Sequence, residues 1–568
     1  MMKDLLNAMS KCEKDDSSQT KPEEPQNGQI PKGEKPKPLR NLTKAMLIFL
    51  VCSAGSVLFS VLKDPSPKNG IWVAPYDFKL FKRKDEQRQP PMTDKLLGGL
   101  LPQGFDENSC LSRYQEALYH KQPTKHPSSY LISRLRRYEV LHKKCGPYTE
   151  SYKRTLESLK SAQHNGTLAT ECNYVVWIAL GGIGNRMLTL ASVFLYAFLT
   201  NRVLLVHPGG YISDLFCEPF PEVSWLLPPD FPIIDKFKTF YQRSPYSYGN
   251  ILRQNNFRNS TEYSLPAFVY LHLAHDYANR DKLFFCDEEQ TPLQKVPWLI
   301  IKTNNYFIPS LFLIESFEEE LHNLFPDKEA VFHLLGRYLF HPTDVVRELI
   351  ARFYEAYLSR ADEVTGIQIR TFGKYSGLYD YVMDLVLGCL RKEVLLPEII
   401  DKKPIMYRSK QLKTKAVIIT SLSSRYSEAL RVMYHGHQTA TGDIIEVYQP
   451  SHEEYQQSGN KMHNIKALAE IYLLSLSDNL VTSAGSTFGY VAQSLGGLKP
   501  WILMIPTNQT ALGPPCQQAV SMEPCFHAPP AYGCGNKKKV DAGQIVPHVQ
   551  HCEDRNLGLK LVEKDKNL

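Results

Sequence analysis

The sequence predicts an α/β protein with two Rossmann-like lobes, a cleft between them and a single N-terminal membrane anchor. Three observations support this fold class: a length of 568 residues, two stretches in which strands alternate with helices, and one uncharged run near the N-terminus. Single domains usually contain about 100–200 residues, so this length favours more than one folded region. Strands that alternate with helices are typical of parallel sheets.

The first alternating stretch begins with a β-rich run at residues 174–180. Glycines follow, then an apolar segment from about residue 185 to 199 that predicts a helix, and then a second strand at residues 203–206. Upstream, between about residues 94 and 161, apolar residues recur at helical spacing. This part of the chain therefore predicts helices that lead into a first parallel sheet.

The second alternating stretch is longer and contains five predicted strands, at residues 363–369, 416–420, 444–448, 480–483 and 501–505. Three predicted helices lie between them: one that ends at Met433, an amphipathic one at residues 463–476 and a short one from Tyr490. In open parallel sheets, ligands bind beyond the carboxyl ends of the strands. The cleft between the two lobes is therefore the expected place for a ligand.

The N-terminal part of the chain differs from the rest. Residues 1–44 are rich in Lys, Glu, Pro, Ser and Gln, which predicts a disordered tail. Residues 45–62 carry no charge, and a run of this length just suffices to cross about 30 Å of hydrocarbon. A buried helix is the alternative, but the position of the run after a solvated tail favours a membrane span. Residues 63–93 are predicted to form a stem or linker.

The orientation of this span follows from the basic residues around it. Its N-terminal side carries four lysines and Arg40 within thirteen residues, whereas only Lys63 and Lys68 lie close on the other side. The positive-inside rule then places the tail in the cytosol and the remainder across the membrane. We expect a single-pass type II membrane protein whose folded part is luminal.

Composition narrows the class of protein further. The net charge of +7 is small for this length and the charges are mixed along the chain, so no nucleic-acid partner is expected. Ten of the twelve cysteines follow the span, and an even set in an oxidising lumen predicts disulfides, with buried free thiols as the alternative. No C-x-x-C occurs, which disfavours a zinc site. Three N-x-S/T triplets are predicted glycosylation sites: Asn165, Asn259 and Asn508.

A glycine-rich loop at residues 181–186 joins a predicted strand to a predicted helix. Glycines allow close approach of backbone N–H groups to a ligand, and a helix N-terminus favours phosphate. Arg186 would be unfavourable at a helix N-terminus without an anionic partner. The loop matches neither a dinucleotide fingerprint nor a P-loop. It is therefore a candidate phosphate contact, with a plain tight turn as the alternative.

Two further segments could hold phosphate. Arg370 ends a predicted strand, where a guanidinium in a cleft could bind a diphosphate in bidentate fashion; a surface salt bridge is the alternative. Ser486 and Thr487 lie between a strand and a helix, where hydroxyl and N–H groups are good phosphate ligands. Ordinary capping of the helix is the other interpretation of this loop.

Carboxylates near aromatic residues provide candidates for a general base. Asp287 is the first candidate and Asp276 the second, both in the acidic and aromatic segment at residues 271–289. A solvated acidic loop is the alternative. The chain contains no D-x-D, a motif common in glycosyltransferases that hold nucleotide phosphate through a metal. We therefore expect a site without a metal ion or other cofactor.

Together these stretches resemble the plant xyloglucan fucosyltransferase family, whose members use GDP-fucose. The similarity covers about residues 95–540, and the stretches that carry it are GGIGNRMLTLASVFLYAFLTNRVLLV from Gly181, LHLAHDYANRDKLFFCDE from Leu271, GIQIR from Gly366, GNKMHNIKALAEIYLLSLSDNLVTS from Gly459 and STFGYVAQSLGGLKPWIL from Ser486. The resemblance implies a GT-B-like fold, a Golgi membrane location, and inverting, metal-independent transfer of L-fucose in α-1,2 linkage to a galactose of a cell-wall glycan such as xyloglucan.

The resemblance also assigns regions and residues. It implies an acceptor-side lobe at residues 94–345, a GDP-fucose-binding lobe at 346–510 and a Cys-containing extension at 511–568. Arg370 would pair with the diphosphate, and the remaining expected substrate-binding residues are Gln368, Ser486, Thr487, Phe488, Gly182, Asn185, Arg186 and His463. A homodimer is a further expectation.

Two positions depart from the family as we know it. Gly485 stands where the family usually has Trp, and Gly373 stands where it usually has an acidic residue. The same donor with arabinogalactan-protein glycans as acceptor is an alternative function. A catalytically silent Golgi scaffold is an alternative of another class, which Arg370 and the Ser-Thr-Phe loop argue against.

Overall fold

The computed structural model describes residues 94–115, 119, 125–160, 171–253, 266–371, 378–400, 412–504, 513–532 and 540–563. All of them belong to one compact unit, Asn69–Leu568. The predicted tail, span and stem, the three predicted glycosylation sites and Gly373 lie outside the described residues. Within the described ranges, no helix has both the length and the apolar character needed to cross a membrane.

The first sheet has four parallel strands in the order β2-β1-β4-β3, which are Val203–Val206, Tyr174–Ile178, Trp298–Lys302 and Phe268–His272. Every residue of β1 and β2 is buried, with no alternation of apolar and polar residues. This burial is typical of a parallel sheet that is covered on both faces. The predicted strands β1 and β2 are confirmed, whereas β3 and β4 were not predicted.

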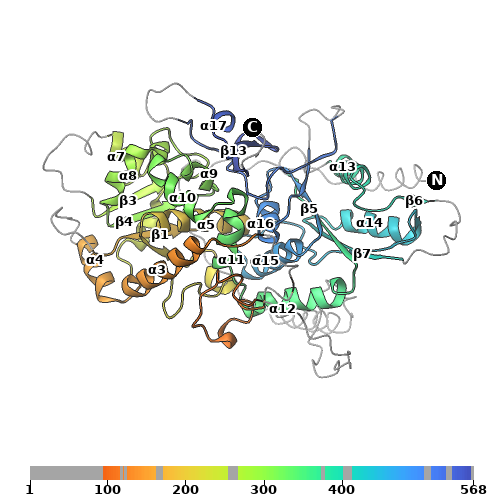
Figure 1. Ribbon diagram of the computed structural model, residues 1–568, viewed down its shortest axis with the longest axis horizontal. Helices are drawn as coiled ribbons and strands as arrows, with labels where there is room; N and C mark the ends of the chain where they lie inside the picture. The colour runs from red at the N-terminus through yellow and green to blue at the C-terminus, as the bar shows by residue number, and fades with distance from the viewer. Residues whose placement is uncertain are drawn as a thin grey trace, which may run out of the picture. The chain divides into compact units, whose positions relative to one another are not determined.

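The helices of this first region are α3 (Ser129–Cys145), α4 (Glu150–Lys160), α5 (Ile183–Leu199), α6 (Ile212–Leu215), α7 (Tyr248–Arg253), α8 (Asp287–Gln294), α9 (Ile308–Leu311), α10 (Glu318–Leu324), α11 (Val331–Leu339) and α12 (Asp344–Phe353). In α5, all residues except Asn185 and Leu199 are buried. A helix that is apolar on every side lies in the interior. Figure 1 shows α5 between the two sheets, beside α11 and α16.

The second sheet has six strands in the order β12-β11-β10-β5-β7-β9, which are Cys516–Gln518, Trp501–Leu503, Asn479–Ser483, Glu363–Ile369, Thr414–Ser421 and Ile444–Tyr448. Five of these strands are parallel, and β12 pairs with β11 in the antiparallel direction. The five predicted strands are all present, and β5 and β9 have the predicted bounds. The predicted α/β class with parallel sheets is therefore confirmed.

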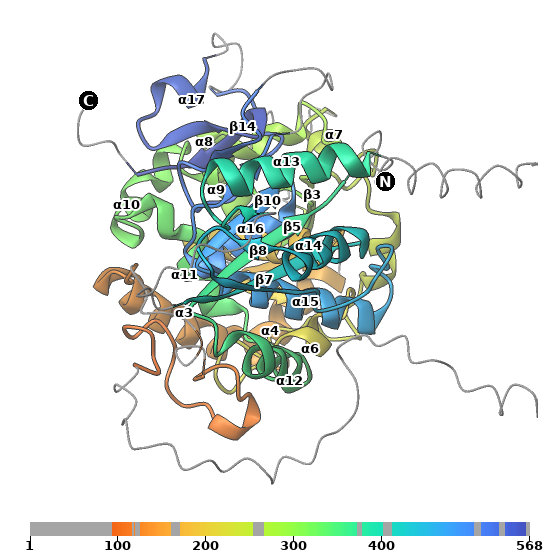
Figure 2. The same ribbon diagram turned by 90° about the vertical axis from the view of Figure 1, so that its right-hand side faces the viewer.

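The second region contains the helices α13 (Tyr379–Lys392), α14 (Arg425–Gly436), α15 (Lys461–Ser475), α16 (Thr487–Gly496) and α17 (Ala542–Ile545). Side chains of α13 and α14 share an apolar cluster with β5 and β7, so these helices cover one face of the sheet. Figure 2 shows α13 and α14 on the side that faces the viewer. Two short antiparallel pairs complete the fold: β6 (Ile399–Ile400) with β8 (Gln438–Thr439), and β13 (Val549–Cys552) with β14 (Arg555–Leu561).

One hydrophobic core connects the two regions. It contains Trp177 of β1, Phe194 of α5, Leu468 of α15, Val491 of α16 and Phe526 of the C-terminal segment. Buried apolar area is the main stabilising contribution in folding. Because the helices α5, α11, α15 and α16 contribute to the same core, the two sheets are held in one unit.

Disulfides, which the sequence predicts without their pairing, are present in the folded part. The structure pairs Cys110 with Cys217, Cys145 with Cys172, Cys389 with Cys516, and Cys525 with Cys552, and Cys286 is also disulfide-bonded. Cys389–Cys516 joins α13 to β12, and Cys525–Cys552 fastens the β13–β14 hairpin. In the chain-entropy account, such links stabilise the fold by restricting the unfolded chain.

Candidate functional site

A cavity of about 380 Å³ opens where the carboxyl ends of β5, β7 and β10 meet the N-termini of α5 and α16. Ligands bind at this edge in parallel α/β sheets. Most of the residues that line the cavity have polar side chains. They come from both regions of the chain: Gly182 to Asn185, Gln368 to Arg370, Thr420 to Leu422, the segment between Ser451 and Glu470, Gly485 to Phe488, His527 and Arg555.

The N-termini of α5 and α16 touch each other at this cavity. A Cβ atom on Gly184 would lie 2.7 Å from the carbonyl carbon of Thr487 and 2.8 Å from the backbone nitrogen of Phe488. Next to this contact, the Thr487 hydroxyl donates to Asn185 Oδ1 at 2.8 Å. Each helix N-terminus carries partial positive charge, so two of them side by side favour an anionic ligand.

Arg370 supplies a full positive charge to the same cavity. Its backbone N–H donates to Ser483 Oγ at 2.8 Å, which ties the end of β5 to the end of β10. Its guanidinium donates through Nη2 to Gln456 Oε1 at 2.8 Å. Burial lowers the pKa of Arg370 from its ordinary value. Gln368, on the same strand, accepts a bond from the Ser483 backbone N–H at 3.3 Å.

Eight of the nine substrate-binding residues expected from the sequence line this one cavity. They are Arg370, Gln368, Ser486, Thr487, Phe488, Gly182, Asn185 and His463. The geometry brings them together from four separate segments of the chain, as the shared carboxyl edge of parallel strands leads one to expect. Their contact with a substrate stays a prediction.

Arg186, the ninth residue, does not line the cavity but lies buried behind its wall. Its guanidinium donates to the carbonyl oxygens of Gly181 and Gly210, both at 2.9 Å, and of Ser458 at 3.1 Å, and to Asn464 Oδ1 at 3.3 Å. These bonds tie the start of α5 to the loop before α15. Arg186 therefore positions the glycine-rich loop, and contact of its own side chain with a substrate is not supported by this geometry.

The structure adds acidic and imidazole groups that sequence patterns did not single out. Glu470 accepts bonds from the backbone N–H and the hydroxyl of Ser451, at 3.1 and 2.6 Å, and burial raises its pKa to about 7. Glu453 accepts from Lys466 at 2.6 Å and pairs with His463 at 3.1 Å. Glu470 is an isolated acidic residue in an apolar stretch of α15, and this sequence feature could have identified it.

His527 also lines the cavity, from the C-terminal segment. Its Nε2 lies 3.1 Å from the hydroxyl oxygen of Tyr490 in α16. Burial, and after it the positive charge of Arg555, lowers the pKa of His527 to about 4. The imidazole is therefore neutral at physiological pH and can serve as a hydrogen-bonding group.

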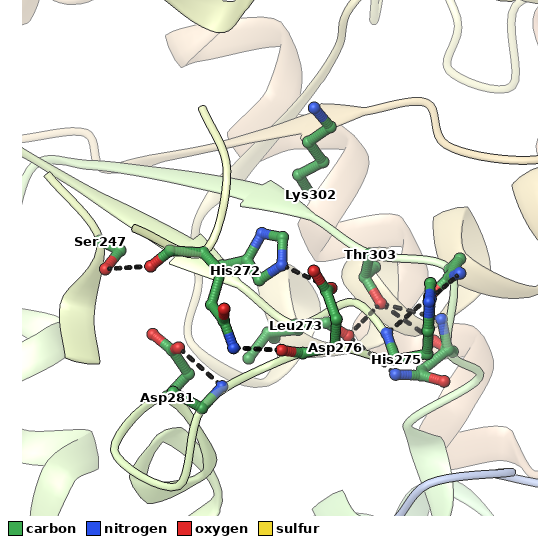
Figure 3. A network of polar contacts seen from close by, with 12 residues as sticks. Ser247, His272, Leu273, His275, Asp276, Asp281, Lys302 and Thr303 are labelled. Atoms are coloured by element: carbon green, nitrogen blue, oxygen red, sulfur yellow. Dashed lines mark hydrogen bonds and ion pairs between the residues drawn. The ribbon is translucent and has the colours of Figure 1, made fainter. Parts of the chain in front are cut away.

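Neither predicted general base lines the cavity. Asp287 begins α8 and accepts the backbone N–H of Ser316 at 2.8 Å, which is a structural contact. Asp276 follows β3, and its Oδ1 lies 2.8 Å from Nε2 of the buried His272. Figure 3 shows this contact, with His275 nearby and Lys302 on the neighbouring strand.

A chain of bonds leads from the segment of Asp276 toward the cavity. The backbone N–H of His275 donates to Asn304 Oδ1 at 2.9 Å, and the Asn304 carbonyl accepts from Asn185 Nδ2 at 3.1 Å. Asn185 itself lines the cavity. Asp276 is 54% exposed on its side chain, so a substrate could reach it. Of the two candidates, Asp276 is the one whose neighbouring residue is linked to the cavity by these bonds, and its role as a base stays a prediction.

A metal ion would need a cluster of suitable ligands. Across the part of the chain that the structure describes, one such group is present, formed by Cys525, Cys552 and Asp554. Cys525 and Cys552 are joined in a disulfide, so neither offers the thiolate that binds metals. The absence of a metal requirement stays a prediction.

Comparison with known proteins relates this arrangement to one family. The family model for xyloglucan fucosyltransferase matches residues 76–535. A galactoside 2-alpha-L-fucosyltransferase of Pisum sativum is 56% identical over 529 residues, which cover 92% of this chain and 93% of the relative. Its counterpart from Arabidopsis thaliana is 54% identical over 530 residues, 92% of each chain.

A solved structure agrees with these sequence matches. A mutant of Arabidopsis thaliana FUT1 in complex with GDP is 56% identical and superimposes with a TM-score of 0.77 over 83% of this chain and 100% of that chain. The family model, the relatives and the shared fold lead to one conclusion: the chain belongs to the xyloglucan fucosyltransferase family.

Proposed function

We propose that this protein transfers L-fucose from GDP-fucose, in α-1,2 linkage, to a galactose of a cell-wall glycan such as xyloglucan. The observation that carries the proposal is the cavity in which Arg370 and two helix N-termini meet. This set of groups suits a nucleoside diphosphate, because it offers positive charge and backbone N–H donors together. The GDP complex of the related FUT1 and the names of the relatives support the choice of donor.

In this reaction the acceptor hydroxyl oxygen bonds to C1 of fucose from the face opposite the leaving group. The C1–O bond to the β-phosphate breaks, and its electron pair leaves with GDP. Negative charge therefore grows on the diphosphate, where Arg370 and the N-termini of α5 and α16 stabilise it. The configuration at C1 is inverted in this single displacement.

The hydroxyl proton needs an acceptor. We propose Asp276 in preference to Asp287 because the bonds through Asn304 connect its segment to the cavity. Burial acts to raise the pKa of Asp276, but the hydrogen bond and the charge of His272, a backbone hydrogen bond and the charge of His275 together outweigh burial, so the pKa is lowered overall. The carboxylate is ionised at neutral pH and can take the proton directly or through a water molecule.

The two sheets correspond to the two lobes of a GT-B-like enzyme in this proposal. The sheet of β5, β7 and β10 carries Arg370 and the loop at Ser486, so it binds the donor. The first sheet carries His272 at the end of β3 and Asp276 just beyond it, so this sheet faces the acceptor. A homodimer stays a prediction.

The direct test is transfer from radiolabelled GDP-fucose to a panel of galactose-bearing acceptors by the full-length protein in detergent. We expect incorporation into xyloglucan from which fucose has been removed, and none into the same glycan after β-galactosidase treatment. If the protein prefers arabinogalactan-protein glycans, the proposed donor stands and the proposed acceptor is wrong. Absence of transfer together with absence of GDP binding would favour the scaffold alternative.

Transfer is expected to persist in EDTA. The proposal uses Arg370 and helix N-termini for the charge on GDP, and these groups need no ion. The measurement compares initial rates after chelation, with and without added manganese. Loss of activity in EDTA that manganese restores would contradict the metal-independent mechanism.

We further propose a Golgi membrane location with the tail in the cytosol and the folded part in the lumen. The charge asymmetry around residues 45–62 supports this orientation. In sealed microsomes the C-terminal part is expected to resist protease until detergent is added, and Asn41 is expected to stay unglycosylated despite its N-x-T triplet. Digestion of the C-terminal part without detergent would contradict the proposed topology.

A further inference from the structure

The C-terminal hairpin reaches the cavity through one residue, Arg555. Arg555 is the first residue of β14, which pairs with β13 and is fastened by the disulfide Cys525–Cys552. It lines the same cavity as Arg370 and the loop before α16. A cationic group is therefore delivered to the candidate donor site from a segment far along the chain.

Gly485 makes room for this arginine. Its backbone has φ +67°, in the left-handed region that favours glycine. A Cβ atom there would lie 2.7 Å from Nη2, 3.1 Å from Nε and 3.2 Å from Cζ of Arg555. The guanidinium thus occupies the space that a side chain at position 485 would fill. Ser486, the residue before α16, follows at once, so the charge lies beside the helix N-terminus.

The acidic residues near Arg555 have other partners. Asp554 Oδ2 accepts from the Gly485 backbone N–H at 2.7 Å and from the Tyr490 hydroxyl at 2.6 Å. Glu553 pairs with Lys560 at 2.7 Å, with both side chains buried. Among the residues that the structure describes, the Arg555 side chain forms no ion pair or hydrogen bond. Its charge is consequently available to a ligand in the cavity.

We propose that Arg555 contacts the diphosphate of the donor as a second arginine beside Arg370, and that Gly485 is required for it to do so. The inference rests on the proposed function, because it names a further contact to the same donor. A guanidinium can bond two phosphate oxygens at once.

Calorimetric titration of the full-length protein with GDP and with guanosine tests the contact. Arg555→Gln removes one charge-assisted bond, so we expect it to weaken GDP binding about tenfold and to leave guanosine binding unchanged. Arg555→Lys should recover part of the loss. Leu557→Ala, on the same strand with a side chain 80% exposed, is the matched control and should bind GDP as the wild type does.

Gly485→Ala tests the second half of the proposal. The added Cβ must displace the guanidinium, so GDP affinity should fall as in Arg555→Gln, and the double variant should be no weaker than either single one. Gly104→Ala is the control for strain, because Gly104 also has a left-handed φ but nothing within 4 Å of its Cβ position. It should lower the melting temperature without changing GDP affinity.

Three outcomes overturn the inference in distinguishable ways. Normal GDP affinity in a folded Arg555→Gln protein would overturn the role of Arg555. Additive losses in the double variant would overturn the requirement for Gly485. A wild-type protein that neither binds GDP nor transfers fucose would overturn the proposed function and this contact with it.

Discussion

Replacement of Arg370 by lysine is expected to slow fucosyl transfer by roughly 30- to 1,000-fold, or ~2–4 kcal/mol, while the fold stays intact. The guanidinium can bond two phosphate oxygens as charge develops, whereas an ammonium acts as a point charge. The side chain lines the cavity and its guanidinium contact with Gln456 is exposed, so the substitution removes little packing. Transfer rates and melting temperatures of the variant and the wild type give the result.

Arg391→Lys is the control for an ordinary surface arginine. Arg391 lies 3.8 Å from Glu398, and both side chains are 67% exposed. Such pairs contribute about 0–1 kcal/mol to stability. If Arg370→Lys behaves like Arg391→Lys in both measurements, Arg370 is a surface ion-pair residue and not the main diphosphate contact.

Gly184→Ala is expected to destabilise the protein by about 1–3 kcal/mol and to weaken GDP binding at least about tenfold. Within a helix, alanine is normally more favourable than glycine by about 1 kcal/mol, so helix propensity alone predicts that the substitution stabilises the protein. Steric overlap outweighs propensity because the Cβ would meet backbone atoms of Thr487 and Phe488 at 2.7 and 2.8 Å. These backbone atoms can move away from the added Cβ only if the N-termini of α5 and α16 separate.

Gly436→Ala provides the matched control. Gly436 is the last residue of α14, and nothing lies within 4 Å of its Cβ position. Its substitution should be neutral or slightly stabilising, and GDP binding should not change. Denaturant unfolding and GDP titration of the two variants separate the effects. A Gly184→Ala protein as stable as Gly436→Ala would show that the two helix starts are not in rigid contact.

The sequence predicts the strands of the second sheet well because each is a short apolar run between glycine, polar or helical segments. The first sheet was predicted only in part. Residues 268–272 and 298–302 form β3 and β4, but the first run overlaps the acidic and aromatic segment that contains the candidate general bases. The run at residues 298–302 is as apolar as the strands that were predicted, so β4 could have been predicted from the sequence.

The candidate site shows the same division between local and tertiary information. Arg370 and the loop at Ser486 could be predicted, because the carboxyl ends of parallel strands share one edge. The direction in which the Arg186 side chain points could not be predicted, because it depends on a carbonyl group of the loop before α15. The start of α16 at Thr487, earlier than predicted, depends on the turn at Gly485. Arg555 carries no pattern that would indicate a ligand.

The contact between α5 and α16 also bears on how GDP leaves after each turnover. Many enzymes with two sheets around a cleft release products by a hinge motion that swings one half away from the other. Here such a swing would have to break the Asn185–Thr487 and Arg186–Ser458 bonds and the bond from the Tyr211 hydroxyl to the Gly459 carbonyl. These bonds and the shared core oppose such a separation. We therefore expect donor and product to exchange through the open side of the cavity, without separation of the two halves.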